Sequence, residues 1–239
     1  KIIFKTTVTE DGVSDLLREH EGIKWYGSRR AGMPILTSQF FSKHQSYARL
    51  EVTHINAKSV KPISGLRRNI ILLERIIRHY AFVWPKSGCA DGKFPIHGDL
   101  SLENILFDDR DIYFIDWEHF SVASAPWGFD IIYLLFETYW FSRQRLLCAH
   151  KDELLFVSRL IRILQTLGPL DERLAKRPLG TVVNFIKNND DLWGHQLKKY
   201  PMKLPILTMS GSDINNIDEL IASNIKRDIN EKIISSRMA

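Results

Sequence analysis

The sequence predicts an α+β protein in which a small antiparallel sheet precedes a larger, mainly helical region. Stretches rich in β-branched and aromatic residues, typical of strands, occupy residues 2–8, 34–41 and 49–55. Apolar residues then recur at helical steps over residues 66–80, and helical patterns dominate from residue 151 onward. Residues 62–65 break the pattern with a proline and a glycine, so we expect one domain at 1–61 and a second at 62–239.

Local signals place the individual elements. The strand at residues 2–8 contains Lys5, and a turn is predicted directly after it. Ser14 is a suitable N-cap residue, so a helix is predicted from there to about Tyr26. Asp130 precedes a strongly apolar stretch and can serve as the N-cap of another helix.

Composition excludes several classes of protein. The chain has 239 residues, of which 44% are hydrophobic and 26% charged, as in ordinary globular proteins. The net charge of +5 comes from scattered basic pairs, which favours a solvated surface over a nucleic-acid-binding one. The apolar runs are too short for a transmembrane segment. Two cysteines, Cys89 and Cys148, offer no disulfide framework, which indicates a cytoplasmic protein.

The polar residues of segment 94–120 form the strongest functional pattern. His97, Asp99 and Asn104 lie on one predicted loop, and Asp116 ends the buried strand that follows. Carboxylate and amide oxygens suit Mg²⁺, and in phosphoryl transfer one aspartate orients the attacking hydroxyl. We therefore expect Asp99 to be catalytic and Asn104 with Asp116 to bind the metal. The alternative is a turn-rich loop in which these side chains cap backbone groups.

Two blocks of this segment resemble a known family. Residues 97–106 read HGDLSLENIL and residues 115–118 read IDWE. Both are similar to signatures of the aminoglycoside phosphotransferase and choline kinase family of small-molecule kinases. The resemblance implies a protein-kinase-like bilobal fold, with the sheet in a small N-lobe and the helices in a larger C-lobe. It also implies transfer of the γ-phosphate of ATP or GTP, with Mg²⁺, to a hydroxyl group of a small molecule.

The resemblance further assigns roles in nucleotide binding. A lysine on an N-lobe strand contacts phosphates and pairs with a helix glutamate, which points to Lys5 and Glu19, with Glu21 as the other candidate. The hinge between the lobes would place Thr53 and Ile55 beside the nucleobase.

The same resemblance assigns roles around the catalytic loop. It makes His97 and Asp99 the catalytic residues of that loop, with His97 helping to organise it, and gives Asp130 the role of steadying the loop. Glu118 could contact the metal or the substrate. No glycine-rich loop precedes Lys5 to cover the phosphates, so we expect the small lobe to be incomplete at its start and the chain to belong to a longer protein.

The resemblance leaves three classes of small molecule as the acceptor of the phosphate: an amino alcohol, a sugar or glycan precursor, or an aminoglycoside. Glu137 or Asp190 with Asp191 could bind a cationic acceptor, although a solvated surface is the simpler account. The aromatic residues that could form a cage for a quaternary ammonium, although core packing explains them better, are Trp127, Tyr139, Trp140, Phe141 and Trp193. A rival from another class is a catalytically silent kinase-like scaffold, which the missing phosphate loop favours.

Overall fold

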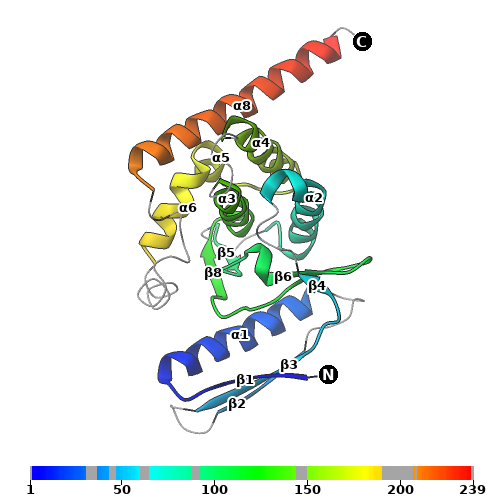
Figure 1. Ribbon diagram of the computed structural model, residues 1–239, viewed down its shortest axis with the longest axis vertical. Helices are drawn as coiled ribbons and strands as arrows, with labels where there is room; N and C mark the ends of the chain where they lie inside the picture. Colours follow the sequence, from blue (N-terminus) through cyan, green and yellow to red (C-terminus); the bar gives the residue numbers. More distant parts are fainter. Residues whose placement is uncertain are drawn as a thin grey trace.

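A small antiparallel sheet lies at one end of the molecule (Figure 1). The computed structural model describes residues 2–30, 37–42, 47–59, 65–87, 92–143, 150–189, 207 and 209–237. The sheet has the strand order β1-β3-β2, with strands β1 (Ile2–Thr7), β2 (Ser38–Ser42) and β3 (Ala48–Thr53). Lys5 pairs with Leu50 across β1 and β3. The small antiparallel sheet predicted from the sequence is confirmed.

Helix α1 (Glu10–Ser28) begins five residues earlier than the sequence predicted. Its N-cap is Thr9, whose hydroxyl accepts a hydrogen bond from the backbone N–H of Gly12 over 3.2 Å. Two acidic residues in the first turn also favour a helix N-terminus. The predicted turn before the helix and the predicted cap at Ser14 are therefore wrong, because Thr9 caps the helix before Ser14 is reached.

Helix α1 belongs to two hydrophobic cores. Near its N-terminus, Leu16 packs with Ala48 and Leu50 of the sheet. Near its C-terminus, Ile23 and Tyr26 are part of the main core. Figure 1 shows the helix lying between the sheet and the remaining structure. A single rigid element therefore connects the two packed regions.

Short strands carry the segment with the functional motif. The predicted hairpin consists of β6 (Ile105–Phe107) and β7 (Ile112–Phe114), in which Ile105 pairs with Phe114. Strand β4 (Lys58–Ser59) adds to the edge of β6. Strand β5 (Phe94–Ile96) precedes the hairpin in the sequence and strand β8 (Ser121–Ala125) follows it. These two strands pair with each other. The two ends of the motif segment are thereby brought together.

Helices form the larger part of the described structure. They are α2 (Gly65–Val83), α3 (Phe129–Arg143), α4 (His150–Leu167), α5 (Glu172–Lys176), α6 (Pro178–Lys187) and α8 (Gly211–Arg237). Helix α3 is central, because residues 131–136 are all buried and the helix contacts α2, α4 and α6. None of the described helices combines the length and the apolar character needed to cross a membrane.

Several sequence-based predictions fall outside the described residues. These are the domain boundary at residue 62, both cysteines (Cys89 and Cys148), Trp193, and the acidic pair Asp190 and Asp191. The side chain of Phe141 is also outside them.

Candidate active site

Asp130 at the start of α3 fixes the backbone of the predicted catalytic loop. Its Oδ2 accepts a hydrogen bond from the backbone N–H of His97 over 3.1 Å, and its Oδ1 accepts one from Gly98 over 3.0 Å. The side chain is fully buried, and this burial raises the pKa of Asp130 to about 7, although the two N–H donors act against the increase. Both donors come from consecutive residues, so the loop is held firmly where it leaves β5.

Glycine is required at position 98 for two independent reasons. Gly98 has a φ angle of 87°, in the left-handed region that side chains disfavour. A Cβ atom there would also lie 2.5 Å from the carbonyl oxygen of His119. The loop therefore passes directly against the segment that follows Asp116.

Both carboxylate oxygens of Asp99 accept hydrogen bonds. Tyr133 donates its hydroxyl to Oδ1 over 2.9 Å, and Asn104 donates Nδ2 to Oδ2 over 3.3 Å and to the Asp99 backbone carbonyl over 2.8 Å. Burial raises the pKa of Asp99, while the hydrogen bond from Tyr133 acts in the opposite direction. Sequence reasoning missed Tyr133. Its position three residues after Asp130 was the available signal, since residues three apart share a helix face.

His97 supports the loop from inside the protein. Burial lowers the pKa of its imidazole to about 4, so the ring is neutral at neutral pH. Its Nε2 donates to the carbonyl oxygen of Ile115 over 2.9 Å, and the ring lies 4.4 Å from that of Trp117. The side chain does not line the cavity described below. His97 thus joins the catalytic loop to the residue before Asp116.

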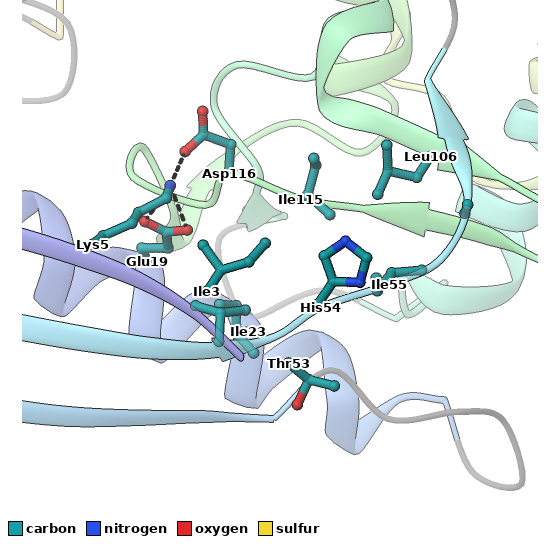
Figure 2. Close-up of a pocket in the computed structure, with 12 residues that line it drawn as sticks. Ile3, Lys5, Glu19, Ile23, Thr53, His54, Ile55, Leu106, Ile115 and Asp116 are labelled. Carbon is teal, nitrogen blue, oxygen red and sulfur yellow. Dashed lines mark hydrogen bonds and ion pairs between the residues drawn. The ribbon is translucent and has the colours of Figure 1, made fainter. Parts of the chain in front are cut away.

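Lys5 is bound by two carboxylates from different parts of the chain. Its Nζ lies 2.8 Å from a carboxylate oxygen of Glu19 on α1 and 2.6 Å from Oδ1 of Asp116 (Figure 2). Glu21, the other sequence candidate, is exposed, whereas Glu19 is buried. Asp116 has a φ angle of 64°, a conformation that non-glycine residues adopt rarely and that clusters at functional sites.

Burial and charge act against each other in this group. Burial alone would lower the pKa of Lys5, but the carboxylates of Asp116 and Glu19 outweigh it and raise that pKa above its ordinary value. Burial raises the pKa of Glu19 to about 7, against the opposing effect of the Lys5 ammonium. Lys5 is therefore a fixed positive charge, and its partners are held close to it.

A cavity of about 410 Å³ opens beside Lys5. It is lined by Ile3, Lys5, Glu19, Ile23, Val52, Thr53, His54, Ile55, Ala57, Leu106, Ile115 and Asp116. Figure 2 shows the charged groups at one end, and Leu106 and Ile115 across the space from Ile3 and Ile23. The cavity can therefore accept a ligand with a flat apolar part and an anionic part.

The predicted hinge residues both line this cavity. The backbone N–H of Thr53 donates to the carbonyl of Thr37 over 3.0 Å, so that donor is used within the sheet. Ile55 packs against the main core and contributes apolar surface.

Glu118 lies outside the lining of this cavity. Its backbone carbonyl accepts a hydrogen bond from Nε of Arg18 over 2.8 Å. Its carboxylate oxygen Oε1 lies 3.4 Å from Nε2 of His119. The contact with Arg18 connects α1 to the segment after Asp116.

The predicted metal ligands offer oxygen atoms. Because Nδ2 of Asn104 is bonded to Asp99, its carbonyl oxygen Oδ1 is the atom left for a cation. Asp116 accepts the hydrogen bond from Lys5 through Oδ1, so its second carboxylate oxygen, Oδ2, is the one that could bind a cation. This donor set fits Mg²⁺. Within the described ranges no three His, Cys, Asp or Glu side chains gather as a metal site. Mg²⁺ usually takes its further ligands from water and substrate phosphates.

Among the candidate acceptor residues that the structure describes, two aromatic side chains are packed inside the protein. Trp127 and Tyr139 are buried members of the main core, as the core-packing alternative predicts. Burial raises the pKa of Glu137, and the nearby carboxylates of Asp99 and Glu103 add to the increase. Glu137 is therefore close enough to the predicted catalytic loop for the charge of Asp99 to act on it.

Comparisons with known proteins agree with the sequence motifs. A family model described as the phosphotransferase enzyme family (APH) matches residues 35–165. This span is more than half of the chain and contains Asp99, Asn104, Asp116 and Asp130. No curated protein and no solved structure matches the chain. The family implies a kinase-like fold and a phosphotransferase activity. The chain belongs to the phosphotransferase enzyme family.

Proposed function

We propose that the protein transfers the γ-phosphate of ATP or GTP to a hydroxyl group of a small molecule. The observation that carries this proposal is the position of Lys5, held between Glu19 and Asp116 at the charged end of an otherwise apolar cavity. A nucleoside triphosphate has the matching distribution of chemistry, with a flat base at one end and a polyanion at the other.

The nucleotide would lie along this cavity. Its base would fit between apolar side chains such as Ile3, Val52 and Leu106, near the hinge residue Ile55. Its phosphates would contact the Lys5 ammonium, which its neighbours keep charged. In this arrangement the sheet and α1 form a small lobe, and the helices form the large lobe.

Asp99 is placed to serve the acceptor. It would accept the hydroxyl proton while the acceptor oxygen forms a bond to the γ-phosphorus and the bond to the departing nucleoside diphosphate breaks. The hydrogen bonds from Tyr133 and Asn104 fix the carboxylate for this task. Asn104 and Asp116 would hold Mg²⁺, which neutralises phosphate charge when bound. His97 and Asp130 are positioning residues.

The first test measures nucleotide binding by thermal shift with Mg²⁺ and ATP or GTP. At a ligand concentration near 100 Kd, binding should stabilise the native state by about 2.7 kcal/mol. For a chain of this size that corresponds to a rise in Tm of roughly 5–10 °C. The rise should disappear in Asp116→Asn. It should persist in Glu172→Gln, which neutralises an exposed carboxylate on α5.

The second test screens hydroxyl acceptors by ³¹P NMR. Amino alcohols, sugars with glycan precursors, and aminoglycosides are the three classes to compare. Transfer that is abolished in Asp99→Asn, while nucleotide binding remains, would support the proposal. Nucleotide binding without any transfer would favour the catalytically silent scaffold, and no nucleotide binding would reject the proposal.

A further inference from the structure

Folding gathers arginines that are scattered in the sequence onto one face of the protein. The exposed side of α2 carries Arg67, Arg68, Arg75 and Arg78. Helix α4 packs beside α2 (Figure 1) and adds an exposed arginine and a partly exposed one, Arg159 and Arg162. We call these six residues and the surface between them the arginine face. The described carboxylates of these two helices are Glu74, Asp152 and Glu153, so the six arginines leave a net positive charge.

The same face exposes large apolar side chains. Ile71 is 77% exposed and Phe82 is 66% exposed, both on the outer side of α2. Leu155 on α4 is 38% exposed. Residues 71, 75, 78 and 82 follow one another at helical steps, so the two apolar side chains on α2 are separated by two arginines. Apolar and basic groups are therefore interspersed along the surface.

A hollow of about 700 Å³ lies between the two helices within this face. Arg78, Arg159 and Arg162 line it, and Phe156 and Ile163 contribute apolar surface to it. Glu74 also lines it and forms an ion pair with Arg159, in which Oε1 lies 3.7 Å from Nη2, so the three arginines outnumber the one carboxylate of the lining. The hollow can therefore take a phosphate group whose remainder is apolar.

We propose that the arginine face binds the surface of a membrane that contains anionic lipids. Guanidinium groups bind phosphate in bidentate fashion, and basic clusters are attracted to anionic lipid surfaces. Apolar side chains on such a face enter the boundary between headgroups and acyl chains. This proposal is independent of the proposed phosphotransfer, since none of its residues lines the cavity beside Lys5.

The arrangement favours a lipid surface over a protein partner. A protein interface concentrates apolar residues in a core that is depleted of charge, with polar residues at the rim. Here Arg75 and Arg78 stand between Ile71 and Phe82, so no such core exists on α2. The basic groups also extend along α2 from Arg67, and the distance to Phe82 is about 22 Å at the rise of an α-helix. Basic groups spread over this length can contact the phosphates of many separate lipid headgroups rather than a single phosphate.

The test is cosedimentation of the whole chain with vesicles of phosphatidylcholine, with and without phosphatidylserine. We expect binding to the vesicles that contain phosphatidylserine. Each arginine should contribute roughly fivefold to partitioning, so Arg75→Ala with Arg78→Ala should weaken binding on the order of 25-fold. Ile71→Ser with Phe82→Ser should weaken it on the order of tenfold.

The matched control is Arg173→Ala with Lys176→Ala, which removes two charges from exposed side chains on α5. If this pair weakens binding as much as the α2 pair does, only net charge matters and the proposal is overturned. No binding to either kind of vesicle also overturns it. So does binding that is insensitive to Ile71 and Phe82 and is equally strong for duplex RNA, since the face would then be a general polyanion site. Urea denaturation of every variant verifies that it is folded.

Discussion

The hydroxyl of Tyr133 donates a hydrogen bond to Oδ1 of Asp99 over 2.9 Å. Tyr133 is buried on α3, three residues after Asp130, which holds the backbone of the same loop. One helix therefore fixes both the backbone and the predicted catalytic carboxylate of the loop.

Replacing Tyr133 with phenylalanine should slow phosphoryl transfer without weakening nucleotide binding. The ring remains in place, but Asp99 loses a hydrogen bond. Because hydrogen bonds to charged groups contribute about 1.5–3 kcal/mol, turnover should fall roughly tenfold or more. Transfer rates and thermal shifts with nucleotide measure the two effects. Tyr80→Phe is the control, because the hydroxyl of Tyr80 accepts a hydrogen bond from the backbone N–H of Gly128. An equal loss of turnover in this variant would contradict the prediction.

Asp130→Asn and Asp218→Asn form a matched pair. Asp218 accepts hydrogen bonds from the backbone N–H groups of Leu179 and Gly180 over 2.8 Å and 3.0 Å, just as Asp130 accepts two from the catalytic loop. In each variant the amide presents an N–H₂ group to a backbone donor, which should cost about 1–3 kcal/mol in urea denaturation. Turnover should fall in Asp130→Asn alone. A similar fall in both variants would show that lost stability, not loop position, is responsible.

Gly22→Ala should destabilise the protein and disturb the nucleotide cavity. An added Cβ would lie 2.6 Å from Cβ of Trp117 and 2.9 Å from Cβ of Phe120, so α1 must shift away. Overpacking of this kind costs typically about 1–3 kcal/mol. Nucleotide binding should weaken as well, because Glu19 moves with the helix. Gly211→Ala on α8 meets no atom within 4 Å and should be tolerated, as denaturation curves of the two variants will show.

His79 should make the protein sensitive to acid. Burial lowers its pKa from 6.5 to about 3, and nearby Arg30 adds to this effect. Below pH 6.5 the imidazole of His79 is therefore protonated in the unfolded chain but stays neutral in the native state. The free energy of unfolding then falls with decreasing pH by up to about 1.4 kcal/mol per pH unit. The loss continues until pH falls through the native pKa.

His79→Gln should reduce this slope while keeping a polar partner for the Tyr26 hydroxyl, which lies 2.9 Å from Nε2 of His79. Urea denaturation at a series of pH values measures it. Above about pH 8 His79 is neutral in both states, so the slopes of the two proteins should agree there. Equal slopes between pH 6.5 and pH 4 would refute the assignment.

The features that the sequence predicted well are those that depend on neighbouring residues. The predicted catalytic loop and the hairpin that follows it lie within one segment, so the local pattern was enough to predict the two strands of the hairpin. The small sheet and the long helices followed from periodicity in the same way. Thr9 and Ser14 are both good N-caps, and the sequence alone did not show which of them the helix would use.

Features that depend on tertiary packing were missed. Tyr133 is one apolar residue among many on α3 until its hydroxyl is seen beside Asp99. Strands β4 and β8 are short and find their partners at distant positions, Leu106 and Ile96 among them. The arginine face takes four of its arginines from α2 and two, Arg159 and Arg162, from α4, which is distant in the sequence. Only the packing of α2 beside α4 brings the two groups together.

The membership of α1 in two cores makes it the helix through which the sheet and the main core are joined. Leu16 packs with the sheet and Ile23 with the main core, and Glu19 lies about midway between them. Lys5 on the sheet is bound both by Glu19 and by Asp116, so these ion pairs cross the same junction. Any change in the angle between the sheet and the helices would therefore have to rearrange the group that holds Lys5.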